Sequence, residues 1–396
     1  MTDLMTDLKK WKTWQDLLTA MQALRHHLHA NPELGFEEHE TAKLIRSILD
    51  QAKISWRAYA GTGTLATLNA TANGQHIALR GDIDALPICE RTSKDWRSTK
   101  DGKMHACGHD GHTATLMTTA LWMKRHEHNL NGPVSFVFQP AEEGLHGAQK
   151  MIEDGALEKI DVIYGWHNWP AIAFGKAICP DGCVMAGNGT FHIAIQGKGG
   201  HSSQPQYCKN PVLAAADIAL DLQKIIDRDL KSKSPTVLSV TSIDAPSGET
   251  IIPETAKLGG SIRVANDKDR DTLFGLIEKS AQNIAKNHDV KVDVTCTPRY
   301  GATTNHAPQA EIMRQSLHKV LGDHWLDRDN ETPIMASEDF SYYLQAIPGA
   351  FALIGANDGK YEHSVSCHSP HYDFNDALIE PVVKIFCDLT GTPLPK

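Results

Sequence analysis

Hydrophobic residues follow two periods in this chain, and the two periods alternate along most of its length. The helical period predicts helices at Trp14–Leu28, Glu37–Ala52, Thr113–Arg125, Gly147–Glu153, Ala310–Leu321, Phe340–Gln345 and Asn375–Leu389. Short apolar runs predict strands at His76–Arg80, Val134–Gln139, Asp161–Gly165 and Ala350–Gly355. Because strands alternate with helices, we expect an α/β domain with a mixed sheet covered by helices on both faces.

The segment at residues 187–300 has a different order of elements. The pattern predicts strand Thr190–Gln196, helix Pro211–Arg228, strands Val237–Ile243 and Lys257–Val264, helix Asp267–Asn287 and strand Val290–Cys296. This βαββαβ order is that of a ferredoxin-like domain. We therefore expect two domains, one formed by residues 1–186 and 301–396, and one inserted at residues 187–300.

The chemistry-bearing residues follow predicted strands or lie next to glycines. The string CGHDGH at residues 107–112 places a thiol and an imidazole two residues apart. Alone, it fits a redox loop, a cysteine nucleophile with its base, or half of a metal site. Glu142 and Glu143 follow one predicted strand, and His167 follows another. Since ligands gather at the carboxyl ends of strands in open α/β sheets, these residues and the later His368 indicate a hydrolytic metal centre.

Composition and charge indicate which binding partners and which cellular compartment to expect. The net charge of −9 and the lack of a long basic run argue against a nucleic-acid partner. No apolar stretch approaches the ~20 residues that span a bilayer, so we expect no membrane partner. The eight scattered cysteines suit free thiols in a reducing cytoplasm. Residues 1–10 carry early acidic residues and precede no apolar core, so we expect no secretory signal and a cytoplasmic protein.

Eight short motifs occur in order and carry a family resemblance. They are LHANPELG at 28–35, RGDIDALP at 80–87, CGHDGH at 107–112, QPAEEG at 139–144, WH at 166–167, GGH at 199–201, SEDF at 337–340 and HSP at 368–370. From about residue 20 to the C-terminus, the chain resembles the M20 metallopeptidases. Within them it is most similar to the N-acyl-amino-acid amidohydrolases, which include hippurate hydrolases and indoleacetyl-amino-acid hydrolases.

The resemblance implies two divalent metal ions per subunit, with zinc, manganese, cobalt or nickel all suited to the mixed donor set. By the family pattern, Cys107 would bridge the ions as a thiolate. His109 and His167 would complete the site of one ion. Glu143 and His368 would complete the site of the other. Glu142 would then be the general base that takes a proton from water and delivers it to the leaving amine.

Further roles are implied outside the ligand set. Asp84 would orient His109 by accepting its second ring N–H. The inserted domain would act as a lid and dimer interface, which predicts a homodimer, and its His201 would stabilise the oxyanion. Arg263 matches a position that binds the substrate carboxylate. Thr250 stands where many relatives have asparagine, and this departure bears on substrate specificity.

The residues beside the expected ligands have ordinary structural interpretations. Asp110 is interpreted as a helix cap and Asp82 as structural. His112 is interpreted as a helix residue with local hydrogen bonds. Cys367 stands one residue from His368, so we expect its side chain to face away as a buried, inert thiol.

These features favour an enzyme that cleaves the amide bond of an N-acyl-amino acid, such as a hippurate-like, N-acetyl or indoleacetyl conjugate. A dipeptidase or aminoacyl peptidase would use the same site. A hydrolase with Cys107 as nucleophile would leave Glu142 and His368 unexplained. A non-catalytic metal-binding protein would have no need of a general base.

Overall fold

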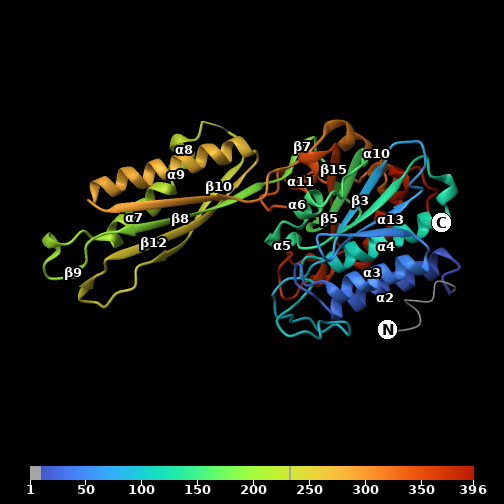
Figure 1. The fold of residues 1–396 in the computed structure, drawn as a ribbon, viewed down its shortest axis with the longest axis horizontal. Helices are drawn as coiled ribbons and strands as arrows, with labels where there is room; N and C mark the ends of the chain where they lie inside the picture. Colours follow the sequence, from blue (N-terminus) through green and yellow to red (C-terminus); the bar gives the residue numbers. More distant parts are fainter. Residues whose placement is uncertain (1–9, 232) are drawn as a thin grey trace. The chain divides into compact units, whose positions relative to one another are not determined.

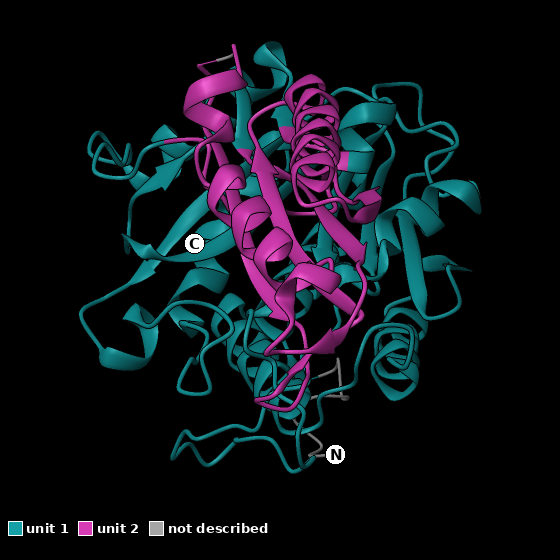
Figure 2. Cartoon of the chain, turned by 90° about the vertical axis from the view of Figure 1, so that its left-hand side faces the viewer, with its two compact units in different colours: residues 1–184, 304–331, 342–396 teal, residues 185–303, 332–341 magenta. Residues whose placement is uncertain are grey.

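The structure is a computed structural model that describes residues 10–231 and 233–396 (Figure 1). Residues 1–9, on which the expected lack of a secretory signal largely rests, lie outside the described residues. The chain divides into two compact units, coloured separately in Figure 2. Unit 1 comprises residues 1–184, 304–331 and 342–396, and unit 2 comprises residues 185–303 and 332–341. In the described parts of the chain, no helix combines the length and apolar character that a membrane crossing requires.

Within the described residues, unit 1 contains a seven-stranded sheet in the order β1-β2-β4-β3-β5-β15-β6. The strands are β1 (Ser55–Tyr59), β2 (Gly63–Leu68), β3 (Ile77–Asp82), β4 (Val134–Gln139), β5 (Val162–Ala173), β6 (Ala177–Ile178) and β15 (Gly349–Asn357). The neighbours β4, β3, β5 and β15 pair in parallel, whereas β1, β2 and β6 pair antiparallel. The predicted mixed sheet is therefore confirmed.

Helices cover this sheet on both faces. The main helices are α2 (Trp14–Ala30), α3 (His39–Gln51), α4 (His109–Arg125), α6 (Gly147–Glu153), α10 (Ala307–Leu321), α11 (Ser341–Ala346) and α13 (Ile379–Leu389). The short helices are η2 (Glu127–Asn129), α5 (Glu142–Leu145), α12 (Tyr361–Ser364) and η4 (Asp376–Leu378). Every residue of β4 is buried, and successive side chains of a strand point to opposite faces, so neither face of this strand meets solvent. Helix α4 packs against α2, α13 and β3.

Several predicted bounds for unit 1 are wrong in informative ways. Strand β5 continues to Ala173, so His167 lies inside a strand and does not follow one. Asp82 is likewise the last residue of β3. The hairpin of β1 and β2 was not predicted, because β1 is largely exposed and its sequence lacks a clear apolar alternation.

In its described residues, unit 2 has a four-stranded antiparallel sheet in the order β10-β12-β8-β13. Its elements are β8 (Gly187–Gln196), β9 (Gly200–His201), η3 (Pro205–Tyr207), α7 (Pro211–Leu222), α8 (Ile225–Asp229), β10 (Thr236–Asp244), β11 (Ile251–Ile252), β12 (Thr255–Val264), α9 (Asp267–Asn287) and β13 (Lys291–Pro298). The short strands β7 (Gly182–Met185) and β14 (Thr303–Asn305) pair at its boundary with unit 1.

The order of the main elements in unit 2 is the predicted βαββαβ arrangement. Phe191, Ile193 and Ile195 alternate with more exposed residues along β8, and they pack into one core with apolar residues of α7 and α9. The predicted helix Pro211–Arg228 is divided into α7 and α8. The ferredoxin-like fold class is confirmed, and the segment 332–341 clusters with it although it is distant in sequence.

Candidate metal centre and active site

The loop before α4 takes its shape from a glycine. Gly108 caps the helix with φ +93°, a left-handed conformation that residues with a Cβ rarely adopt. A Cβ at this position would lie 2.4 Å from Oδ1 of Asn168 and 2.6 Å from the hydroxyl of Tyr372. The glycine therefore lets the ligand loop pack directly against Asn168 of β5 and against Tyr372. Cys107 and His109, on either side of it, are both buried.

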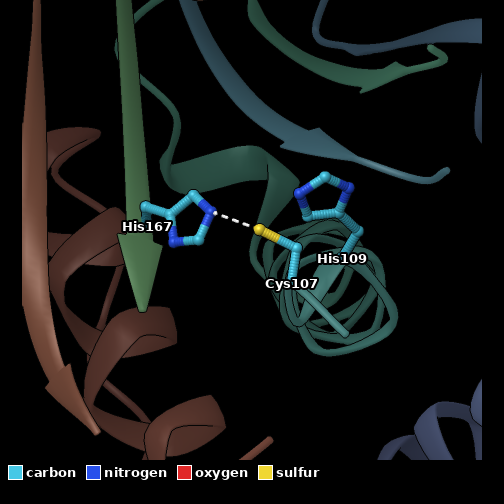
Figure 3. A group of neighbouring side chains, drawn as sticks. All are labelled: Cys107, His109 and His167. Atoms are coloured by element: carbon cyan, nitrogen blue, oxygen red, sulfur yellow. Dashed lines mark hydrogen bonds between the residues drawn. The ribbon is translucent and has the colours of Figure 1, made fainter. Parts of the chain in front are cut away.

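Cys107, His109 and His167 form the first cluster of potential metal ligands. One ligand atom from each side chain lies within 4.8 Å of the other two. The sulfur of Cys107 is 3.3 Å from Nε2 of His167. Figure 3 shows the thiol between the two imidazoles, with Cys107 and His109 at the start of α4 and His167 on β5. Such a group could hold one divalent ion.

Cys107 also belongs to a second cluster, with Glu143 and His368. Oε1 of Glu143 lies 3.0 Å from Nε2 of His368, whose side chain is 53% exposed. His109, Glu142 and Glu143 form a further cluster within the same 4.8 Å limit. The clusters share members, so the structure brings all six of these predicted site residues together in unit 1.

The two adjacent glutamates sit in a turn that is not regular helix. Ala141 has φ +54°, Glu143 has ψ 72°, and Gly144 has φ +84°. These left-handed and non-helical angles turn the backbone sharply at each position, so neighbouring side chains can point in different directions. Glu142 is buried and Glu143 is half-buried.

Hydrogen bonds fix which nitrogen of each imidazole can bind a metal. Nδ1 of His109 lies 3.0 Å from the carbonyl of Asp84, and Nδ1 of His167 lies 2.6 Å from the carbonyl of Asn168. A carbonyl only accepts, so both Nδ1 atoms carry hydrogen, and Nε2 is the nitrogen of each ring that is left to bind a metal. The carboxylate of Asp84 approaches Nδ1 of His109 at 3.1 Å and accepts the backbone N–H of Glu143 at 2.9 Å.

The electrostatics of the site favour a cation. Burial lowers the pKa of His109, but the charges of Asp82 and Asp84 outweigh it and raise the pKa to about 10. Burial and the neighbouring His112 lower the pKa of His167, so this imidazole is neutral. The hydrogen bond with Cys367 and burial raise the pKa of Cys107, so a metal would have to displace its proton. Without a metal, the carboxylates are compensated by a proton on His109.

The donor set fits divalent metal ions. Among the described residues, Nε2 of His109 is buried and has no hydrogen-bond partner, although ligand atoms surround it. Oε1 of Glu143 also makes no hydrogen bond of acceptable geometry. A buried polar atom without a hydrogen-bond partner destabilises the folded protein, and coordination of a metal ion would give such an atom a partner. Thiolate, imidazole and carboxylate together suit zinc and its neighbours in the first transition series.

A neighbouring group of Asp82, His109 and His112 has the residue types of a metal site, but its atoms are already used. Nδ1 of His112 donates to Asp82 at 2.6 Å, and its Nε2 accepts the N–H of Asn168 at 3.3 Å. Arg80 pairs with the other carboxylate oxygen of Asp82 at 2.6 Å. The interpretation of His112 as a locally bonded helix residue is therefore wrong, because its partners are distant in sequence and adjoin both imidazole ligands.

Asp110 is not the helix cap that its position suggested, since Gly108 occupies that position. Its carboxylate lies 2.8 Å from Nδ1 of His29 and 3.0 Å from Nε of Arg25, and all three side chains are buried. Arg25 also pairs with Asp373. A sequence offers no sign of this pairing, because the partners belong to three separate segments of the chain.

Two further residues near the site were missed. Glu38 is buried and accepts the N–H of Ala141 at 2.9 Å, which fixes the turn before Glu142. Asn168 links His112 to His167 through its main chain, and its side chain donates to Tyr372 at 2.8 Å. The predicted orientation of Cys367 is also wrong, because its thiol faces Cys107 and donates to the carbonyl oxygen of that residue at 3.9 Å. Asn168 directly follows the WH motif at 166–167, and Glu38 follows shortly after the motif that ends at Gly35; this nearness was the available sign in the sequence.

The remaining predicted residues belong to unit 2. His201 is exposed on β9, and its Nδ1 accepts the backbone N–H of Ser203 at 3.1 Å. The carbonyl of Thr250 accepts the N–H of Ser202 at 2.9 Å, so Thr250 adjoins the His201 loop. Arg263 is on β12 and donates to the hydroxyl of Ser337 at 2.7 Å.

The chain is similar to several known hydrolases and to the solved structure of a metal-binding peptidase. The IAA-amino acid hydrolase ILR1-like 2 of Arabidopsis thaliana is 36% identical, over 96% of this chain and 86% of its own length. The hippurate hydrolase of Campylobacter jejuni is 33% identical, over 94% of this chain and 96% of its own. The crystal structure of the Bacillus subtilis YXEP protein, described as a dinuclear metal binding peptidase, superimposes with a TM-score of 0.82 at 30% identity, covering 95% and 98% of the two chains.

The family profile for peptidase family M20/M25/M40 matches residues 78–391, which include every residue of the three clusters. This match extends over more than half of the chain. The chain therefore belongs to the peptidase family M20/M25/M40 and is a hydrolase of that family.

Proposed function

We propose that this protein is a dinuclear metal amidohydrolase that cleaves an N-acyl-amino acid into a carboxylic acid and a free amino acid. The observation that carries the proposal is the position of Cys107, whose sulfur belongs to two ligand clusters at once. A thiolate shared in this way can serve two ions. Relatives named as hydrolases of hippurate and of IAA-amino acids support this substrate class.

In this proposal, His109 and His167 would hold one ion, Glu143 and His368 would hold the other, and Cys107 would contribute to both sites. Bound divalent ions would polarise the amide carbonyl and acidify the attacking water. The carboxylate of Asp84 makes two hydrogen bonds that position the site: one orients His109, and the other holds the backbone N–H of Glu143.

Glu142 acts as the general base. Its carboxylate is buried and shares a cluster with His109 and Glu143, so it is close to the proposed reacting centre. It takes a proton from the attacking water and then delivers that proton to the nitrogen of the leaving amino acid. Glu143 would bind the metal, and the bent turn lets the side chains of Glu142 and Glu143 point in different directions for proton transfer and metal binding.

We assign the supporting roles to unit 2. His201 donates a hydrogen bond to the developing oxyanion in a homodimer, from its own or the partner subunit. The support is its tautomer: since Nδ1 accepts from Ser203, the hydrogen of the neutral ring is on Nε2. Arg263 binds the substrate carboxylate, and Thr250 contributes to substrate choice. We place the protein in the cytoplasm.

Metal content tests the ligand set. Each of Cys107, His109 and His368 is changed to Ala, and bound metal is measured after loading with zinc, manganese, cobalt or nickel. We expect each variant to lose metal and turnover together. His318→Ala is the matched control, because this histidine is exposed on a surface helix. Variants that keep wild-type metal content would contradict the assignment.

A substrate panel separates the competing functions. Hippurate, N-acetyl and indoleacetyl amino acids are compared with dipeptides that have a free amino group, with and without a chelator. Preference for acylated substrates and reversible loss with chelator support the proposal. Preference for dipeptides would indicate a peptidase. Chelator-resistant activity with an acyl group trapped on Cys107 would indicate a cysteine hydrolase, and metal binding without turnover would indicate a non-catalytic protein.

A further inference from the structure

A second cysteine lies against the candidate bridging thiol. The backbone N–H of His368 donates to the carbonyl of Ala106 at 2.8 Å, which holds the two segments side by side. The thiol of Cys367 donates to the carbonyl oxygen of Cys107, with the sulfur 3.9 Å from that oxygen. This pairing joins positions 260 residues apart in the chain.

We propose that Cys107 and Cys367 are a site of reversible oxidative modification, in which a peroxide converts the two thiols to a disulfide when no metal is bound. The inference rests on the proposed function, because it takes Cys107 to be the shared metal ligand. The disulfide would remove that ligand and block metal loading.

The geometry suits this bond. Disulfides need Cα atoms about 4.4–6.8 Å apart and side chains that face each other. Cys107 and Cys367 are the neighbours of a hydrogen-bonded backbone pair, and the sulfur of Cys367 lies 3.9 Å from the main-chain oxygen of Cys107. The amide of Asn168 lies 3.8 Å from the sulfur of Cys367 while it also donates to Tyr372, so the position of the second thiol is fixed.

Exposure decides the order of events. Cys107 is only 8% exposed, whereas Cys367 is half-buried and therefore meets the oxidant first. The sulfur of Cys367 attacks one peroxide oxygen, the O–O bond breaks, and a sulfenic acid and one water form. The sulfur of Cys107 then attacks the sulfenic sulfur, the S–S bond forms, and a second water leaves. The two sulfurs together lose two electrons, the peroxide gains them, and both thiol protons end in water.

A bound metal would protect the pair. A thiolate held between two cations is not free to attack the sulfenic sulfur, and a disulfide sulfur is no longer an anionic ligand. Oxidation and metal binding therefore compete for Cys107, and a dithiol reductant restores the site by thiol–disulfide exchange.

Peptide mapping after oxidation provides the test. Metal-free and metal-loaded wild-type proteins are treated with hydrogen peroxide, digested without reductant and analysed by mass spectrometry, and zinc uptake is measured in parallel. We expect a cross-linked peptide containing Cys107 and Cys367 in the metal-free sample, with loss of zinc uptake that dithiothreitol reverses. The metal-loaded sample should form far less of this peptide.

Matched variants make the result specific. Cys367→Ser should still take up zinc after peroxide treatment, whereas Cys89→Ser, which removes an exposed cysteine, should behave like the wild type. Absence of the cross-linked peptide, or a pairing with another cysteine, would overturn the inference even if Cys367→Ser does not fold. If the disulfide forms and zinc uptake is unchanged, Cys107 is not a metal ligand, and the proposed function fails while the modification site stands.

Discussion

The protonation of His29 should contribute measurably to stability, because the ring lies between two carboxylates. Its Nδ1 is 2.8 Å from Asp110 and its Nε2 is 3.3 Å from Glu90. Burial alone lowers the pKa of His29, but the charge and hydrogen bond of Asp110, with a hydrogen bond from Glu90, raise it to about 9. The folded protein therefore holds a buried imidazolium at neutral pH.

The size and sign of the effect follow from linkage. An unfolded histidine has a pKa of about 6.5, and a tenfold change in proton affinity corresponds to about 1.4 kcal/mol. Because the folded pKa is raised, the stabilisation is complete below about pH 6.5 and is lost as pH rises through about 9. The loss amounts to about 3 kcal/mol. The stability advantage of wild type over His29→Gln should shrink by that amount across this range.

Tryptophan fluorescence is a suitable assay because all eight tryptophans lie in the residues of unit 1, which also contains His29. Urea unfolding of the metal-free proteins would be followed at a series of pH values. His318→Gln serves as control, since its imidazole is exposed and faces a highly exposed carboxylate. A difference between wild type and His29→Gln that does not change with pH would refute the reasoning, as would an NMR titration of His29 near its ordinary pKa.

Three other changes have defined outcomes. Glu142→Gln should keep bound metal but lower kcat by roughly 10²–10⁴-fold, because an amide cannot accept the proton; a few-fold loss would exclude this base. Burial raises the pKa of Glu38 to about 7, so its ionisation costs stability as pH rises from about 4.5 through 7. Urea unfolding of unit 1 should show that the free energy of unfolding of Glu38→Gln increases relative to that of wild type over this pH range. A difference between the two proteins that does not change with pH would contradict the raised pKa. Arg263→Ala should abolish the preference for an N-acyl amino acid over its methyl ester, measured as kcat/KM; an unchanged preference would remove Arg263 from substrate binding.

Much of the fold could be predicted because its strands and helices carry clear periods. The alternation along β8 and the apolar run of β4 each indicated an element of the correct type. The ends of β5 could not be predicted in the same way, since a strand buried on both faces loses its alternation and its polar residues look like a loop. The pattern therefore places His167 in a loop, although it lies within the strand.

The site residues that lie in short sequence motifs could be predicted, whereas their contacts with distant segments could not. No local pattern indicated that Asp110 would meet Arg25, because buried ion pairs depend on which segments pack together. Likewise, the contact between Cys107 and Cys367 depends on a backbone pairing between loops. Sequence patterns record the side chain needed at one position, whereas these interactions belong to the assembled tertiary structure.

The strand order of unit 1 has a consequence for biosynthesis. Strands β8, β10, β12 and β13 of unit 2 all lie within residues 187–298, so this sheet can form once that segment has left the ribosome. The sheet of unit 1 must wait longer, because β15 pairs with both β5 and β6 and ends only at Asn357. Until then, the apolar edge of β5 has no partner on that side and invites incorrect pairing. His368 emerges later still, so we expect metal to be acquired only at the end of translation or after release.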